Sequence, residues 1–189
     1  KIGILAVQGD FREHGQMLTS IGQEWEEIRL PSQLCDLDGL IIPGGESTTI
    51  IQLMDTYGLR APLKDLATKG LAIWGTCAGM IVVAKRLSDK KPVPLGLMDI
   101  EVSRNAFGRQ INSFETEISV EEIEGPPVHA VFIRAPQVIN VGPNVNVLST
   151  LESGDPVAIR ENKILATSFH PELTQDARIH ELFVRIAGS

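Results

Sequence analysis

Short apolar runs alternate with amphipathic stretches along the first half of the chain. The apolar runs predict strands at residues 2–7, 39–42 and 71–74. The stretches that follow them have helical spacing and predict helices over residues 12–21, 47–57 and 61–69, with another helix beginning near Cys77. Strands that alternate with helices usually pair in parallel, so this order predicts a mostly parallel sheet covered by helices on both faces.

The pattern changes from about Met98 onward. Residues 117–120 and 128–133 alternate apolar and polar positions between Gly, Pro and Asn turns, which predicts strands, some of them antiparallel. Residues 164–169 form a late apolar strand, and residues 175–186 a closing helix with one apolar face. The prediction is therefore an α/β fold of three layers, with some antiparallel strands in its second half.

Length and charge narrow the classes of function. A chain of 189 residues suits one domain, residues 1–189. The formal charge of −7 and the absence of a Lys/Arg run argue against a nucleic-acid surface. No stretch reaches membrane-spanning length and no signal-peptide pattern opens the chain, so we expect a cytoplasmic protein. In that compartment Cys35 and Cys77 are expected to be free thiols, with Cys35 a packing residue.

The sequence Gly-Thr-Cys-Ala-Gly at residues 75–79 follows a predicted strand and opens a helix. It matches a nucleophile elbow with Cys77 in the place of serine. The helix N-terminus behind the thiol favours the thiolate, and the backbone N–H of Ala78 faces a developing oxyanion. The alternative is a small buried cysteine between two packing glycines.

His170, Pro171 and Glu172 directly follow the late strand. Residues two apart in extended chain point the same way, and Pro171 keeps His170 out of helical geometry. Glu172 can then hold one ring nitrogen of His170 while the other nitrogen faces Cys77. We predict a Cys-His-Glu triad; alternatively, His170 is a surface histidine and Glu172 an ordinary first-turn glutamate.

The glycine pair Gly44 and Gly45 lies between a predicted strand and a predicted helix. Such a loop lets backbone amides approach a substrate, and we expect it to supply a second oxyanion donor. The Lys of a phosphate-binding loop is absent and the spacing does not fit. A plain turn with Ser47 or Thr48 as helix cap is the simpler alternative.

These segments resemble the class I, triad-type glutamine amidotransferases, and among them the glutaminases that serve pyridoxal 5'-phosphate synthesis. The resemblance spans essentially the whole chain. Beyond the elbow and the His-Pro-Glu sequence it rests on four segments, at residues 5–14, 43–49, 104–110 and 132–136.

The resemblance implies a flavodoxin-like fold and hydrolysis of L-glutamine to glutamate and ammonia. It implies that Cys77 attacks the carboxamide, that His170 handles protons and that Glu172 orients His170. Six further residues match positions that contact glutamine in the family: Glu46, Ser47, Thr48, Arg104, Ile133 and Arg134. Arg104 and Arg134 could instead be solvated surface charges.

The resemblance also implies a partner, a barrel-shaped synthase subunit that takes up the ammonia. Through that synthase it places the chain among lyases as well as hydrolases. We expect weak glutaminase activity until the partner organises the loop at Gly44 and Gly45.

No cofactor and no metal site are expected. His14, His129 and His180 lack ligand spacing and are assigned to the surface or an interface, and Arg109 has no assigned role. Three other functions stay open: the glutaminase of another pathway such as histidine biosynthesis, a non-catalytic glutamine-binding sensor, and a cysteine hydrolase of other specificity.

Overall fold

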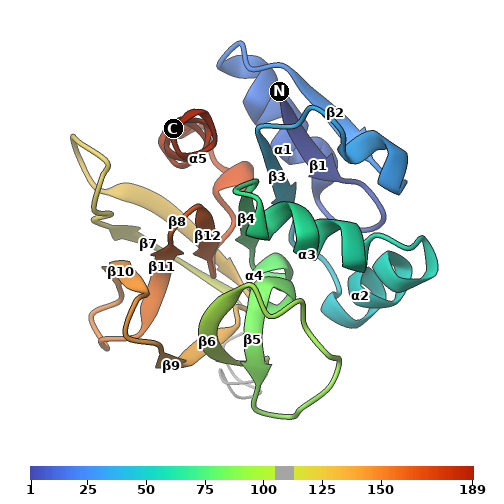
Figure 1. Ribbon diagram of the computed structural model, residues 1–189. Helices are drawn as coiled ribbons and strands as arrows, with labels where there is room; N and C mark the ends of the chain where they lie inside the picture. Colours follow the sequence, from blue (N-terminus) through green and yellow to red (C-terminus); the bar gives the residue numbers. More distant parts are fainter. Residues whose placement is uncertain (105–112) are drawn as a thin grey trace.

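The computed structural model describes residues 1–104 and 113–189. Its central sheet is built from β1 (Ile2–Leu5), β2 (Trp25–Ile28), β3 (Gly39–Ile42), β4 (Ala72–Thr76), β10 (Asn146–Thr150), β11 (Pro156–Glu161) and β12 (Ile164–Thr167). The strand order is β10-β11-β12-β4-β3-β1-β2 (Figure 1). The run from β12 to β2 is parallel, while β10 and β11 pair antiparallel at one edge. The parallel part has the flavodoxin order, so the predicted sheet is confirmed.

The central strands face two hydrophobic cores because successive strand residues point to opposite faces. Ile41 and Trp74 belong to one core, which α1 and α5 cover, whereas Ile42 and Ile73 belong to the other, which α2, α3 and α4 cover. The helices are α1 (Phe11–Ser20), α2 (Ser47–Thr56), α3 (Arg60–Thr68), α4 (Ala78–Val83) and α5 (Arg178–Gly188). The predicted three layers are therefore present.

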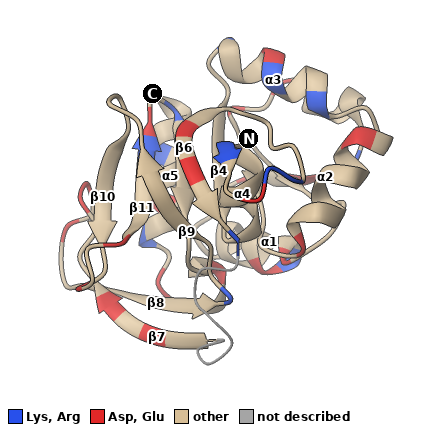
Figure 2. Cartoon of the chain, turned by 90° about the horizontal axis from the view of Figure 1, so that it is seen from below, with Lys and Arg blue, Asp and Glu red and all other residues tan. Residues whose placement is uncertain are grey.

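The second half of the chain adds two small sheets beside the central one (Figure 1). One contains β5 (Ala84–Leu87), β6 (Met98–Ser103) and β9 (Gln137–Val141), and the other pairs β7 (Ser113–Ile118) with β8 (Val128–Ile133). Short 3-10 turns occur at η1 (Pro31–Leu34) and η2 (Pro171–Leu173). Figure 2 shows acidic positions along β6 and β7, whereas β8, β9 and β10 have no Lys, Arg, Asp or Glu.

Several elements differ from the prediction. The strand expected at residues 117–120 is β7, which runs from Ser113 to Ile118 and ends before Ser119. The closing helix begins at Arg178, because η2 intervenes and the Asp176 carboxylate accepts a hydrogen bond from the Arg178 backbone N–H at 3.1 Å. The edge strand β2 was not predicted, since its sequence Trp-Glu-Glu-Ile has neither an apolar run nor strict alternation. Within the described ranges, no helix has both the length and the apolar character needed to cross a lipid bilayer.

Candidate active site

Three neighbouring parallel strands, β3, β4 and β12, end at the same edge of the sheet. Thr76 at the end of β4 pairs with Thr167 of β12, and Ile42 at the end of β3 pairs with Gly75 of β4. The segments that follow these strands therefore emerge side by side, at the carboxyl edge where parallel sheets place their ligands. They carry the glycine loop, the cysteine and the histidine that the sequence singled out.

Cys77 occupies a tight turn between β4 and α4. Its backbone lies at φ 48° and ψ −103°, a conformation that strains a residue with a side chain. Its backbone N–H donates to the Thr167 carbonyl at 2.8 Å, which fixes the turn against β12. A Cβ at Gly75 would come within 2.3 Å of the Gly79 carbonyl oxygen, so the turn requires glycine there. The strand, turn and helix that the sequence predicted around Cys77 are all present.

The structure brings Cys77, His170 and Glu172 together. The Nδ1 atom of His170 lies 2.6 Å from Oε1 of Glu172, and the Cys77 thiol is close enough to the His170 ring to raise its pKa. Because Nδ1 is engaged by the carboxylate, Nε2 is the ring atom that serves the thiol. All three side chains are buried. This is the order of contacts in a nucleophile, base and orienting acid.

Charge within this cluster is set by competition between burial and pairing. Burial disfavours the imidazolium of His170, but hydrogen bonds and charges from Cys77 and Glu172 outweigh it and raise the pKa of His170 to about 10. Burial also raises the pKa of Glu172, against the hydrogen bond and charge of His170. An imidazolium held beside a thiol is the arrangement that supports a reactive thiolate.

The turn that places Glu172 differs from the extended geometry expected from the sequence. His170 has φ −111° and ψ 83°, and the next three residues form the 3-10 turn η2. The carboxylate thus reaches the ring by curling back after Pro171. The expected contact forms, but the reason given for it was wrong.

The loop at Gly44 and Gly45 packs directly against the histidine. A Cβ at Gly44 would lie 2.5 Å from Cε1 of His170, so only glycine fits there. The Gly44 carbonyl accepts a hydrogen bond from the Asp10 backbone N–H at 3.0 Å, and Oε1 of Gln8 accepts one from the Glu46 N–H at 2.8 Å. The segment after β1 therefore sets the conformation of the glycine loop.

Glu46 caps helix α2, a role that the sequence had left to Ser47 or Thr48. Its carboxylate accepts from the backbone N–H groups of Thr48 at 3.1 Å and Thr49 at 2.7 Å. Slight burial opposes ionisation, but the hydrogen bonds from Thr49 and Thr48 prevail and lower the pKa of Glu46. Ser47 is buried at the start of the helix.

The other expected substrate contacts surround the same edge. The carbonyl oxygen of Ile133 lies 3.7 Å from Sγ of Cys77, and the exposed Arg134 follows it at φ 45°. Arg104 donates from Nη1 to the Thr48 hydroxyl at 3.1 Å and is paired with Asp89. The rest of the motif that begins at Arg104, residues 105–110 with Arg109, lies outside the described residues.

Asp10 joins the site without having been singled out individually. Its Oδ2 lies 3.7 Å from Nδ1 of His170, and partial burial raises the pKa of Asp10 although the charge of His170 lowers it. One potential metal-ligand atom from each of Asp10, His170 and Glu172 lies within 4.8 Å of the other two. His170 Nδ1 is already bound to Glu172, however, so the arrangement suits proton handling better than metal binding.

Two histidines assigned to the surface or an interface are instead buried inside the chain, behind the site. His14 and His180 have no exposed side-chain area, and their Nδ1 and Nε2 atoms, respectively, lie 2.9 Å apart. His14 lies one helical turn before Leu18, on the buried face of α1. This spacing was the signal in the sequence that His14 is buried. His129 is exposed, between Glu115 and Glu117.

The expectation for Cys35 was also wrong, because this residue is exposed. It directly follows the 3-10 turn η1, where the preceding Leu34 takes the buried position.

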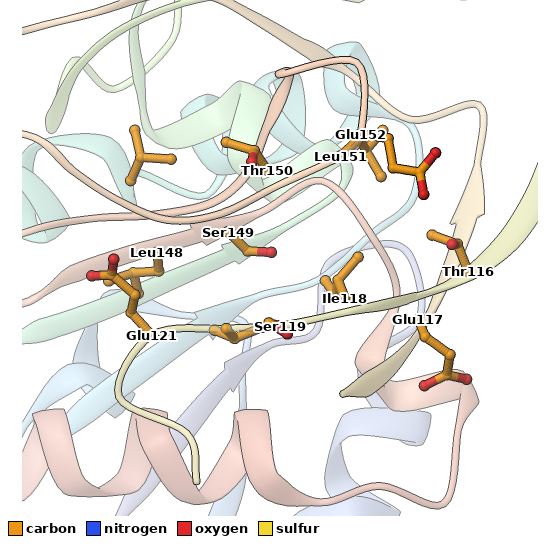
Figure 3. A pocket seen from close by; sticks show the side chains of 12 residues that line it. Thr116, Glu117, Ile118, Ser119, Glu121, Leu148, Ser149, Thr150, Leu151 and Glu152 are labelled. Atoms are coloured by element: carbon orange, nitrogen blue, oxygen red, sulfur yellow. The ribbon is translucent and has the colours of Figure 1, made fainter. Parts of the chain in front are cut away.

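A hollow of about 750 Å³ lies elsewhere, between the end of β7 and strand β10 (Figure 3). The triad residues are not among those that line it, which are Thr116, Glu117, Ile118, Ser119, Val120, Glu121, Val147, Leu148, Ser149, Thr150, Leu151 and Glu152. This hollow therefore does not coincide with the predicted triad.

Comparison with known proteins gives matches over nearly the whole chain. Residues 4–188 match the SNO glutamine amidotransferase family. The chain is 57% identical to "Pyridoxal 5'-phosphate synthase subunit PdxT" of Dehalococcoides mccartyi, over 99% of this chain and 97% of that protein. It is 52% identical to the protein of the same name from Frankia alni, over 100% of this chain and 96% of that protein. A solved structure described as a glutamine amidotransferase superposes with a TM-score of 0.94 at 46% identity, covering 100% of this chain and 99% of the other.

Proposed function

The chain belongs to the SNO glutamine amidotransferase family, and we propose that it is the glutaminase subunit of a pyridoxal 5'-phosphate synthase, with Cys77 as nucleophile. Relatives named as subunits of that synthase match over nearly their whole length. The observation that carries the assignment of residues is the His170–Glu172 hydrogen bond beside the buried Cys77 thiol at the carboxyl edge of the sheet.

The reaction follows from this series. The Cys77 thiolate attacks the carboxamide carbon of L-glutamine, and collapse of the tetrahedral intermediate breaks the C–N bond. The protonated His170 gives its proton to the departing ammonia, which leaves a thioester on Cys77. His170 then takes a proton from water as the water attacks the thioester, and glutamate is released. Glu172 holds the ring so that Nε2 faces the sulfur throughout.

Backbone groups around Cys77 are suited to stabilise the oxyanion. Ala78 begins α4 directly after the nucleophile, and the loop of Gly44 and Gly45 lies against His170 on the other side. We assign substrate contacts to the residues around this edge of the sheet: Glu46, Ser47, Thr48, Arg104, Ile133 and Arg134. Of the two arginines, Arg134 suits the substrate carboxylate, since Arg104 is already paired with Asp89.

The ammonia needs an acceptor, and we propose a separate synthase subunit, barrel-shaped as in the family, as the partner. Activation by this partner would act through the glycine loop. The loop must present a backbone N–H to the oxyanion, and its present conformation is held by the hydrogen bond from the Asp10 N–H to the Gly44 carbonyl. The chain would work in the cytoplasm as one glutaminase domain, since a thiolate nucleophile persists in a reducing compartment. Its own step is a hydrolysis, so the expected lyase class does not apply to this chain.

The test is glutamate release from L-glutamine by the wild-type chain and by Cys77→Ala, each with and without the synthase subunit. Pyridoxal 5'-phosphate is followed in the same mixtures. Partner-stimulated release that requires Cys77 and is coupled to the cofactor supports the proposal. Release that requires Cys77 but ignores this partner would contradict the pathway, and release that persists in Cys77→Ala would contradict the nucleophile.

A further inference from the structure

A buried pair of histidines lies behind the triad, on the far side of Glu172 from His170. Nε2 of His14 lies 3.5 Å from Oε2 of Glu172 and 3.1 Å from the Thr76 hydroxyl. His14 belongs to α1, Thr76 is the last residue of β4 before Cys77, and Glu172 lies in η2. His14 thus touches both the strand that carries the nucleophile and the turn that carries the acid.

The Oε2 atom of Glu172 needs such a neighbour. It is buried and has no hydrogen-bond partner, whereas Oε1 is bound to His170. A buried carboxylate oxygen without a donor disfavours the ionised form, and the triad requires that form. Whether His14 helps or harms depends on which of its ring nitrogens carries the proton.

Both histidines are neutral, so each ring has one N–H. Burial and the nearby histidines hold the pKa of His14 well below its usual range, and burial lowers the pKa of His180 to about 3. Nδ1 of His14 and Nε2 of His180 lie 2.9 Å apart, so one of the two donates to the other. Two arrangements are therefore available.

In the first arrangement His14 donates from Nδ1 to His180. The proton of His180 must then be on its Nδ1, which is buried without a partner, and a buried orphan N–H is rarely tolerated. The bare Nε2 of His14 would then accept from the Thr76 hydroxyl at 3.1 Å and would offer no N–H to the Glu172 carboxylate. Both consequences are unfavourable.

In the second arrangement His180 donates from Nε2 to Nδ1 of His14. The partnerless atom of His180 is then a bare nitrogen. The proton of His14 is on Nε2, where it donates to the Thr76 hydroxyl at 3.1 Å and lies beside Oε2 of Glu172, 3.5 Å from Nε2. Trp74 packs edge-on against both rings, with centroid distances of 5.4 Å to His14 and 4.8 Å to His180, which holds their orientation.

We propose that His14 is a positioning residue: its Nε2–H, oriented by His180, stabilises the charged form of Glu172 and so keeps His170 aligned on Cys77. The effect of His14 on catalysis rests on the proposed function. The ring nitrogens that carry the protons in His14 and His180 do not depend on that function. Removal of the N–H should lower kcat for glutamate release about tenfold, less than the loss of a full hydrogen bond to a charged group, because Nε2 of His14 lies 3.5 Å from Oε2 of Glu172. KM should change little, because His14 lies behind the triad.

The first experiment reads the ring nitrogens of the wild-type chain by long-range ¹H–¹⁵N NMR, which is practical because the chain has four histidines. We expect the proton on Nε2 in both His14 and His180. A proton on Nδ1 of His14 would overturn the proposal. This measurement needs no substrate, so it decides the proton arrangement even if the chain proved not to be a glutaminase.

The second experiment compares His14→Leu, which has no donor, with His14→Gln, whose amide can donate near the former Nε2 position. His129→Gln, at an exposed site on β8, is the control and should behave as wild type. We expect a lower kcat and a lower pKa of His170 in the Leu variant. In the Gln variant kcat and the His170 pKa should return most of the way to their wild-type values.

Two results would overturn the proposal: the same kcat and the same His170 pKa in folded Leu and Gln variants, or a wild-type His170 pKa in the Leu variant. If the Leu variant does not fold, a Gln variant with the same His170 pKa as wild type supports the proposal and one with a clearly lower pKa overturns it.

Discussion

Oε1 of Glu172 lies 2.6 Å from Nδ1 of His170, in a buried turn that opens just after strand β12. The contact fixes which nitrogen of the imidazole serves Cys77. In a triad of this kind the acid acts by holding the ring tautomer and by stabilising the imidazolium.

Glu172→Gln should therefore lower kcat by about 10⁴-fold, because an amide keeps the shape of the side chain but can hold the wrong tautomer. The measurement is the steady-state rate of glutamate release with the partner present. Glu181→Gln, at an exposed glutamate on α5, is the matched control. A rate for Glu172→Gln near that of the control would show that Glu172 does not orient His170.

Gly44→Ala should reduce glutaminase activity by about a hundredfold, the cost of misplacing a reacting group by about 1 Å. The added Cβ would meet Cε1 of His170 at 2.5 Å, so either the ring or the loop must shift. Gly188→Ala adds the same methyl group where nothing lies within 4 Å and should leave the rate unchanged. Equal activity in the two variants would mean that the packing of loop and ring has no catalytic importance.

His170 should keep its proton from neutral pH until the solution approaches pH 10. Burial acts against the proton, but the hydrogen bonds and charges of Cys77 and Glu172 raise the pKa of His170 to about 10. Since His170 must be protonated to release ammonia, kcat/KM should fall only as the pH rises through this range. An NMR titration should also give a lower His170 pKa in Cys77→Ala, and an unchanged value there would refute the thiol–imidazole coupling.

The buried histidines should make the protein sensitive to acid. Burial lowers the pKa of His180 to about 3 from the 6.5 of an unperturbed histidine. The unfolded state therefore binds more protons between these values, and the free energy of unfolding should decrease as the pH falls from about 6.5 toward 3. His180→Phe, which cannot be protonated, should show a shallower decrease in urea denaturation over this pH range. Parallel curves for the two proteins would contradict the neutral state of His180.

Local sequence was enough to predict the elbow and the sheet. Gly75 and Gly79 bracket Cys77 at the end of an apolar strand, and this order of residues leaves few other conformations. The parallel core was predictable because each apolar run is followed by a helix. The edge strand β2 was missed, since half-exposed glutamates replace the apolar run there.

The contact between the two histidines behind the triad could not be predicted from local patterns. His14 and His180 are 166 positions apart, and their burial depends on α1 and α5 covering the same face of the sheet around Trp74. A polar side chain on an apolar helix face is compatible with a surface position until its partner is known. The cap of α2 was assigned to Ser47 or Thr48 for a similar reason, because a glutamate one residue earlier is not a common helix cap.

The most direct test of the central claim is covalent trapping with an electrophilic glutamine analogue, read by mass spectrometry of the intact and digested protein. We predict one adduct per chain, mapped to Cys77, retained in Cys35→Ser and lost in Cys77→Ala. The exposed Cys35 makes this comparison informative, since a merely reactive thiol would be modified there. An adduct on Cys35, or glutamate release that continues without Cys77, would contradict the assignment of Cys77 as the nucleophile of a glutaminase.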